Sequence, residues 1–181
     1  MFEHDYTING VHATYLKHLA RDKDSKDKPY VFDRYIDVYM NAAIWGLLCG
    51  RLGVRDTVSK DRARVYADAF ATERDDCVLS YRLVMLLDET THLSPEERVD
   101  RAFRDDAEAA TSEKMIKNME LFHNYVLGGI ELLYERISDG CTTQVDYIDR
   151  LYKLMAVFGE ELSDTSYEQR LAKLMPKLMS E

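Results

Sequence analysis

Two Glu-x-x-His motifs are the residues in this sequence best suited to catalysis or metal binding. Glu89 lies three positions before His92, and Glu120 lies three positions before His123. On an α-helix this spacing directs a carboxylate and an imidazole to one side, and two facing motifs of this kind belong to the ligand set of di-iron carboxylate proteins. However, His92 is followed at once by Leu-Ser-Pro, which indicates a helix end, and the predicted helix over residues 32–52 offers no inward glutamate. We therefore expect no bound metal and no cofactor, and we keep Glu89, His92, Glu120 and His123 as an alternative metal site.

His123 is also the only polar member of a long apolar seam. Its neighbours at alternating steps of three and four all fall on one face of a helix. A single polar residue on such a face is typical of a buried, hydrogen-bonded histidine or of a group that sets helix register, and we expect this role. A ligand or a catalytic base is the alternative. The apolar members of the seam are Ile116, Met119, Val126, Ile130, Leu133 and Ile137.

A second polar group, Glu73 with Arg74, lies within a helix predicted over residues 59–89. Arg74 continues the apolar face that Phe70 and Cys77 define. A guanidinium at such a position must reach water along its aliphatic stem or pair with a carboxylate. We expect an ion pair, either buried or at the edge of the core, and anion or substrate binding is the alternative. The candidate polar core site therefore consists of His123, Glu120, Glu73 and Arg74.

Four glycines are predicted at close helix contacts. Gly46 and Gly50 lie near the end of the helix predicted over residues 32–52, and Gly128 and Gly129 are adjacent within the apolar seam. A glycine inside a helix costs about 1 kcal/mol relative to alanine, so their presence indicates a packing or contact reason. Without a Cβ atom, two helix backbones can approach closely. We expect a tight helix crossing here, with a ligand pocket or a dimer seam as the alternatives.

Helical periodicity covers nearly the whole chain and predicts an all-α, single-domain bundle of six or seven helices, mostly antiparallel neighbours. The clearest helix start is Ser94-Pro95, because Ser94 can cap the helix and Glu97 can complete a capping box. This helix is expected to bury Val99, Ala102 and Phe103. Whether residues 94–137 form one helix or two is left open. The other predicted helices cover residues 11–20, 32–52, 59–89, 112–139 and 143–163, with a last one from 164 or 165.

The chain divides into three predicted parts. Residues 1–29 form an N-terminal arm, a short helix with a charged linker, which packs on its own bundle, clasps a partner or stays mobile. Residues 30–165 form the helical bundle, whose last helix should turn its apolar stripe inward. Residues 166–181 form an amphipathic helix packed on the bundle. The inward stripe of the last bundle helix consists of Val145, Ile148, Tyr152, Met155, Phe158 and Leu162.

Composition narrows the class of protein. A net charge of −9 without a segregated basic face argues against direct nucleic-acid binding. The longest uncharged run, Val38–Gly50, has 13 residues and is too short to span a membrane. Three cysteines without metal-ligand spacing favour reduced thiols in the cytoplasm, and the first residues do not resemble a signal peptide.

No motif in the sequence is diagnostic, so three functional hypotheses remain. The first is a small cytosolic interaction or assembly subunit without catalysis, acting on a protein partner or on itself as a homodimer. The second is a metal-binding or di-iron-like helical enzyme that uses Glu120 and His123. The third is an acidic regulator that mimics nucleic acid through the acidic face around residues 96–113.

Overall fold

The computed structural model describes residues 1–21, 28–105 and 112–163, with side chains as far as residue 156. It is predominantly helical with one small sheet, which confirms the all-α prediction. In chain order the elements are β1 (Tyr6–Asn9), α1 (Val11–Leu19), α2 (Tyr35–Leu48), β2 (Arg62–Val65), α3 (Ala67–Thr72), α4 (Arg74–Leu87), α5 (Pro95–Phe103), α6 (Glu113–Leu133), the π-helical turn η2 (Tyr134–Ser138) and α7 (Gln144–Ser163).

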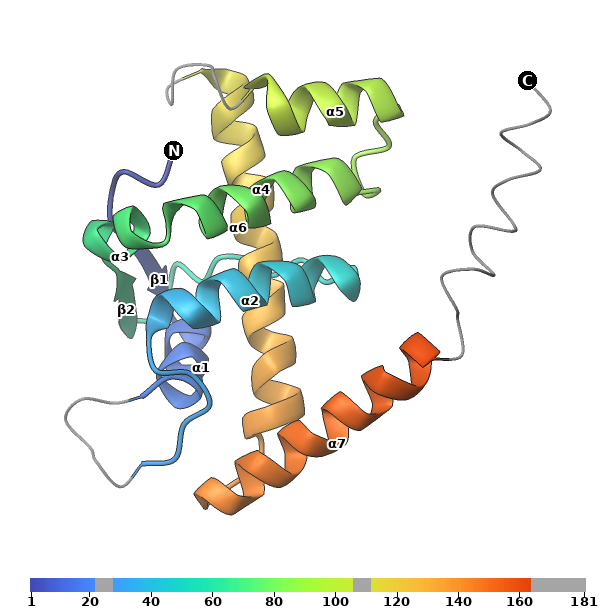
Figure 1. Cartoon of the computed structure of the whole chain (residues 1–181). Helices are drawn as coiled ribbons and strands as arrows, with labels where there is room; N and C mark the ends of the chain where they lie inside the picture. Colours follow the sequence, from blue (N-terminus) through green and yellow to red (C-terminus); the bar gives the residue numbers. More distant parts are fainter. Residues whose placement is uncertain (22–27, 106–111, 164–181) are drawn as a thin grey trace.

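The long helix α6 runs through the middle of the molecule, α2 and α4 cross it, and α5 packs on α4 (Figure 1). Ser112 caps α6 by accepting a hydrogen bond from the backbone N–H of Met115, at 3.1 Å. Because α5 ends at Phe103 and α6 begins at Glu113, residues 94–137 do not form one helix, and the last of them, from Tyr134, belong to η2. The predicted seam is buried from Val126 onward, but Ile116 is 55% exposed, so its burial was wrongly predicted.

The backbones of α2 and α6 approach closely at glycines. A Cβ atom at Gly46 would collide with the carbonyl oxygen of Tyr125, and one at Gly129 would collide with the carbonyl oxygen of Ala42. Gly128 lies in the same way against the carbonyl of Arg51, just after α2. These contacts leave no room for a side chain.

Gly50 has a different role from the other three glycines. A Cβ atom there would meet nothing within 4 Å, and the residue has a φ of +61°. Gly50 therefore serves the left-handed turn that follows α2, and its assignment to close helix packing does not hold.

Residues 62–65 form a strand, so the prediction of one continuous helix over residues 59–89 is wrong. Arg62-Ala63-Arg64-Val65 alternates charged and apolar residues, with Ala63 and Val65 buried, which is the period of a strand. The strand pairs antiparallel with β1, matching Tyr6 with Val65. The rest of the predicted helix is divided at Glu73 into α3 and α4.

Helix α1 packs on its own chain, the first of the three possibilities for the N-terminal segment. Ala13, Leu16 and Leu19 are fully buried in the common core, and an isolated bridge joins Ala20 to Phe32. Most of the charged linker, residues 22–27, and the predicted C-terminal helix, residues 166–181, lie outside the described residues.

Helix α5 begins as predicted but presents a different face to the core. Ser94 and Glu97 form the reciprocal capping box, which confirms the predicted start. Of the three side chains expected inward, only Ala102 is buried, whereas Val99 and Phe103 are about half exposed. The buried polar side chain Arg101 takes part of the inner face, which rotates the apolar pair outward.

Helix α7 has two apolar faces. Tyr147 is buried, and Leu151 and Leu154 pack against the core. Four side chains of the stripe that the sequence predicted to be inward lie on the other face and are exposed by 57% to 75%, and the other two, Phe158 and Leu162, lie beyond the described side chains. Since the helix touches the body on only one side, this second face faces solvent. We call it the α7 stripe, consisting of Val145, Ile148, Tyr152 and Met155.

Substituting Gly129 with alanine should test the crossing of α2 and α6. The added methyl group collides with backbone rather than with a flexible side chain, so we expect a loss of about 2 kcal/mol or more of unfolding free energy. Urea unfolding followed by circular dichroism measures the change. Gly50→Asn is the matched control, because asparagine tolerates the left-handed turn and the space is open. Equal stability of the two variants would contradict the crossing.

Candidate functional site

The four residues of the predicted polar core site do not lie together. Glu73 forms an ion pair with Arg34 at 2.5 Å, where α3 meets α4, and Arg74 is exposed at the start of α4. Glu120 and His123 line one surface cleft on α6. Of the predicted site, therefore, only Glu120 and His123 lie at one place in the molecule.

The four residues of the alternative metal site do not come together either. Glu89 and His92 are exposed in the connection between α4 and α5, where His92 has a φ of 53°. Within residues 1–21, 28–105 and 112–163, no group of three His, Cys, Asp or Glu side chains is arranged to hold a metal ion. Glu89 and His92 lie in the connection after α4, whereas Glu120 and His123 lie on α6, so the two Glu-x-x-His motifs belong to different elements.

His123 lies against aromatic side chains. Its ring stacks on that of Tyr6, with centroids 3.8 Å apart and an angle of 10° between the planes. Its Nε2 atom shares a hydrogen bond with the hydroxyl of the fully buried Tyr39 at 3.0 Å. Helix α6 thus supplies the imidazole, while β1 and α2 supply the two tyrosines that hold it.

Burial, together with the nearby positive charge of Arg55, lowers the pKa of His123 to about 3. The imidazole is therefore neutral near pH 7. A group with so low a pKa is a weak proton acceptor, because an efficient general base has a pKa near the working pH. This ring can stack and hydrogen-bond, but it is poorly suited to acid–base catalysis.

The cleft at His123 has a volume of about 370 Å³. Ile116, Met119 and Leu127 of α6 form its apolar part, and the stacked Tyr6 and His123 form another side. Apolar walls with a few polar groups are typical of sites that bind small molecules. We refer to this feature as the His123 cleft.

Two opposite charges also line the His123 cleft. Arg55 comes from the segment between α2 and β2, and Glu120 comes from α6; both are exposed. Across the part of the chain that the structure describes, neither side chain makes a hydrogen bond or an ion pair. Sequence reasoning did not single out Arg55, because nothing in its local pattern shows that it comes near α6.

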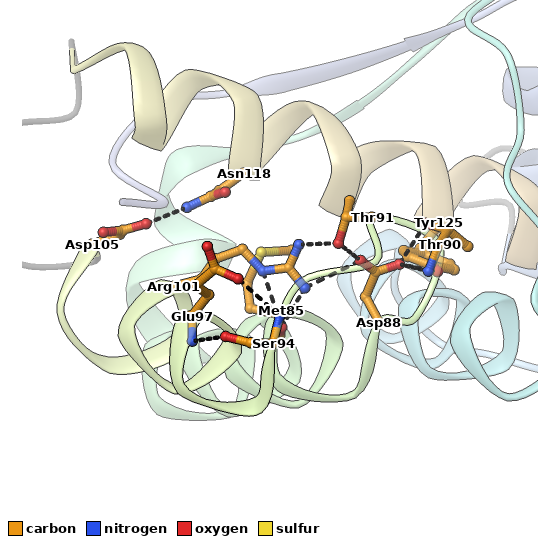
Figure 2. Close-up of polar contacts among 10 residues, drawn as sticks. All are labelled: Met85, Asp88, Thr90, Thr91, Ser94, Glu97, Arg101, Asp105, Asn118 and Tyr125. Carbon is orange, nitrogen blue, oxygen red and sulfur yellow. Dashed lines mark hydrogen bonds and ion pairs between the residues drawn. The ribbon is translucent and has the colours of Figure 1, made fainter.

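A second polar cluster, around Asp88, was missed by sequence reasoning; Asp88, Arg101 and Tyr125 are buried in it, whereas Thr90 and Thr91 lie at its exposed edge. The carboxylate of Asp88 accepts hydrogen bonds from the hydroxyls of Thr90, Thr91 and Tyr125, each at 2.6 Å, and pairs with Arg101 at 3.1 Å (Figure 2). Burial alone would raise the pKa of Asp88, but these hydrogen bonds together hold it well below its usual range. The carboxylate is therefore charged at neutral pH.

Arg101 joins this cluster to the end of α4. Its guanidinium donates to the backbone carbonyl of Met85 through Nε at 3.0 Å and Nη2 at 2.5 Å, and to the hydroxyl of Thr91 at 3.0 Å. The cluster thus satisfies a carbonyl near the C-terminus of α4 and connects α4, α5 and α6. Because the charges of Asp88 and Arg101 are buried and are satisfied by groups of the chain itself, the cluster can hold these helices together.

A third polar connection joins α1 to α6. His12, also buried, contacts Glu131 through Nε2 at 2.8 Å, and Glu131 pairs with Arg51 at 3.0 Å. Among the described residues, the Nδ1 atom of His12 has no hydrogen-bond partner. This group ties the first helix and the turn after α2 to the C-terminal half of α6.

No family model, curated protein or solved structure matches this chain. Among the described residues, no helix combines the length and the apolar character needed to cross a membrane.

The low pKa of His123 predicts a pH-dependent stability. The unfolded side chain titrates near pH 6.5 and the folded one near pH 3, so the unfolded state binds more protons between these values. The contribution of His123 is complete above about pH 6.5 and is lost as the pH falls. From pH 7 to pH 5 the wild type should lose about 1 to 2 kcal/mol more unfolding free energy than His123→Gln.

Urea unfolding at both pH values measures this difference. His92→Gln, which removes an exposed histidine, is the matched control and should keep the pH dependence of the wild type. The assignment fails if His123→Gln keeps that dependence as well.

Removal of the charge of Asp88 should destabilise the fold strongly. Asp88→Asn preserves the shape of the side chain but leaves Arg101 buried without a counter-charge, which costs about 3 to 5 kcal/mol. Asp100→Asn is the control, because its partner Arg104 is largely exposed and surface pairs contribute little. Chemical unfolding at pH 7 compares the two. Similar losses of unfolding free energy in both variants would contradict a larger contribution from the buried pair.

Proposed function

We propose that this protein is a small cytosolic assembly subunit that acts without catalysis and pairs with a second copy of itself through α7. The observation that carries the proposal is the α7 stripe, an apolar face that has no partner within the described chain although the opposite face of the same helix packs on the core. A helix with two apolar faces needs two partners, and the described part of its own chain supplies one.

The spacing of the stripe supports a helix as the second partner. Val145, Ile148, Tyr152 and Met155 follow one another at steps of three, four and three. This is the repeat of positions a and d in a coiled coil, where the side chains of two helices interlock. All four side chains are more than half exposed, so the stripe is available without rearrangement of the core.

A second copy of this chain is the partner that the surface fits best. In a two-fold symmetric pair, the same patch serves both subunits, so one apolar stripe is sufficient. Exposed charges of both signs, Asp149 and Lys153, border the stripe and can provide a polar rim with acid facing base across an antiparallel pair. Figure 1 places α7 beside the C-terminal end of α6 and far from α5, and among the described elements η2 is its main contact.

Two further observations agree with a non-catalytic cytosolic protein. The neutral imidazole of His123 is a weak base, and the described metal-ligating side chains form no cluster. Cys49, Cys77 and Cys141 are all free thiols, which suits a reducing compartment.

The molecular mass in solution tests the pairing. By size-exclusion chromatography with light scattering, we expect wild type at twice the monomer mass of 21.0 kDa, and Ile148→Lys at the monomer mass at the same concentration. Burial of the lysine charge between two apolar helix faces is unfavourable, so this substitution should prevent pairing. Ile148 is 57% exposed in the monomer, so the variant should keep its helical circular dichroism.

Leu79→Lys is the matched control. Leu79 is 56% exposed on α4 and lies in a separate apolar groove beside Phe103. This variant should remain a dimer. The proposal is overturned if the wild type is a monomer. It is also overturned if Leu79→Lys is a monomer while Ile148→Lys remains a dimer.

A further inference from the structure

The His123 cleft is not explained by pairing through α7. Its lining residues come from β1, the segment after α2 and the first two-thirds of α6, and none of them belongs to the α7 stripe. Its apolar wall includes Ile116, which is 55% exposed. An exposed aliphatic side chain in a concave surface is a common feature of a ligand site.

The aromatic lining of the cleft favours a ligand with an aromatic ring. The rings of Tyr6 and His123 are nearly parallel and in contact, and the hydroxyl of Tyr39 shares a hydrogen bond with the imidazole. The aromatic pair is therefore rigid and already formed. Aromatic rings favour offset stacking or edge contacts with one another, and the cleft volume of about 370 Å³ is sufficient for a molecule of one or two rings.

The charge of the cleft favours an anion at Arg55. This guanidinium is near enough to His123 and Tyr6 to influence both side chains electrostatically, yet no carboxylate of the described residues pairs with it. A planar guanidinium donates two parallel hydrogen bonds to a carboxylate, which makes arginine well suited to this group. The side chain of Asn124, which also lines the cleft, adds a neutral donor and acceptor.

We propose that the His123 cleft binds a small aromatic carboxylate, with the ring system against Tyr6, His123 and Ile116 and the carboxylate paired with Arg55. The neutral imidazole contributes an apolar face and no competing charge. Glu120, on the rim of the same cleft, disfavours a second negative group on the ligand and so restricts the class to monoanions.

Titration with 2-naphthoate tests this site in the full chain. Isothermal calorimetry should show saturable binding of 2-naphthoate at about tenfold higher affinity than the neutral 2-naphthamide, which has the same rings but no charge for the guanidinium. Arg55→Gln should abolish the preference for the carboxylate, and Arg62→Gln, another exposed arginine on the adjacent β2, should retain it. Neither side chain is buried, so both variants should fold.

Amide chemical shifts locate the binding. With 2-naphthoate the largest changes should fall on Tyr6, Ile116 and Asn124. The proposal is overturned if 2-naphthoate shows no saturable binding at millimolar concentration, if Arg55→Gln binds it as wild type does, or if the shifts centre on Leu83 and Phe103 in the other groove. These results are independent of the mass in solution, because the Ile148→Lys monomer retains the whole cleft.

Discussion

The close crossing of α2 and α6 is the constraint on which the rest of this structure depends. Gly46 faces the backbone at Tyr125, and Gly129 faces the backbone at Ala42, so the two helices meet along their main chains. The chain after α2 continues the contact, where the N–H of Gly53 donates to the carbonyl of Asn124 at 2.8 Å. With the helices at this distance, Tyr39 can reach His123, and the segment that carries Arg55 comes to lie beside the same helix.

Helix α6 then acts as the common partner of three polar connections. His123 contacts Tyr39 of α2, Tyr125 contacts Asp88 after α4, and Glu131 contacts His12 of α1. Apolar packing has little directionality, whereas a buried polar pair is satisfied in only one arrangement. A shift of α6 by one turn would leave several of these groups unpaired, at about 1 to 3 kcal/mol each. The three connections therefore select one register among the many that a smooth apolar helix would permit.

Sequence reasoning succeeded where local patterns decide the structure and failed where distant contacts do. The capping box at Ser94 and Glu97 and the apolar period of α6 were readable because their partners lie within a few residues. The cluster of Asp88 could not be predicted in this way. Tyr125 lies 37 positions from Asp88, and in the sequence Arg101 resembles any charged residue on a helix surface. The Asp88-x-Thr90-Thr91 pattern was the one local sign, since hydroxyls commonly bond a carboxylate close by. Both strands are only four residues long, too short to outweigh the helical pattern around them.

The most direct test of this account is the contact between α2 and α6 at their glycines. The position of a Cβ atom at Gly129 would lie 2.8 Å from the Cα of Ala42, so a Gly129 Hα proton points at the backbone of α2. A nuclear Overhauser spectrum of the labelled protein should therefore show a strong cross-peak between the Hα protons of Gly129 and the backbone protons of Ala42. Its absence, in a spectrum that resolves the sequential peaks of both helices, would contradict the crossing and the arrangement of the polar groups that depends on it.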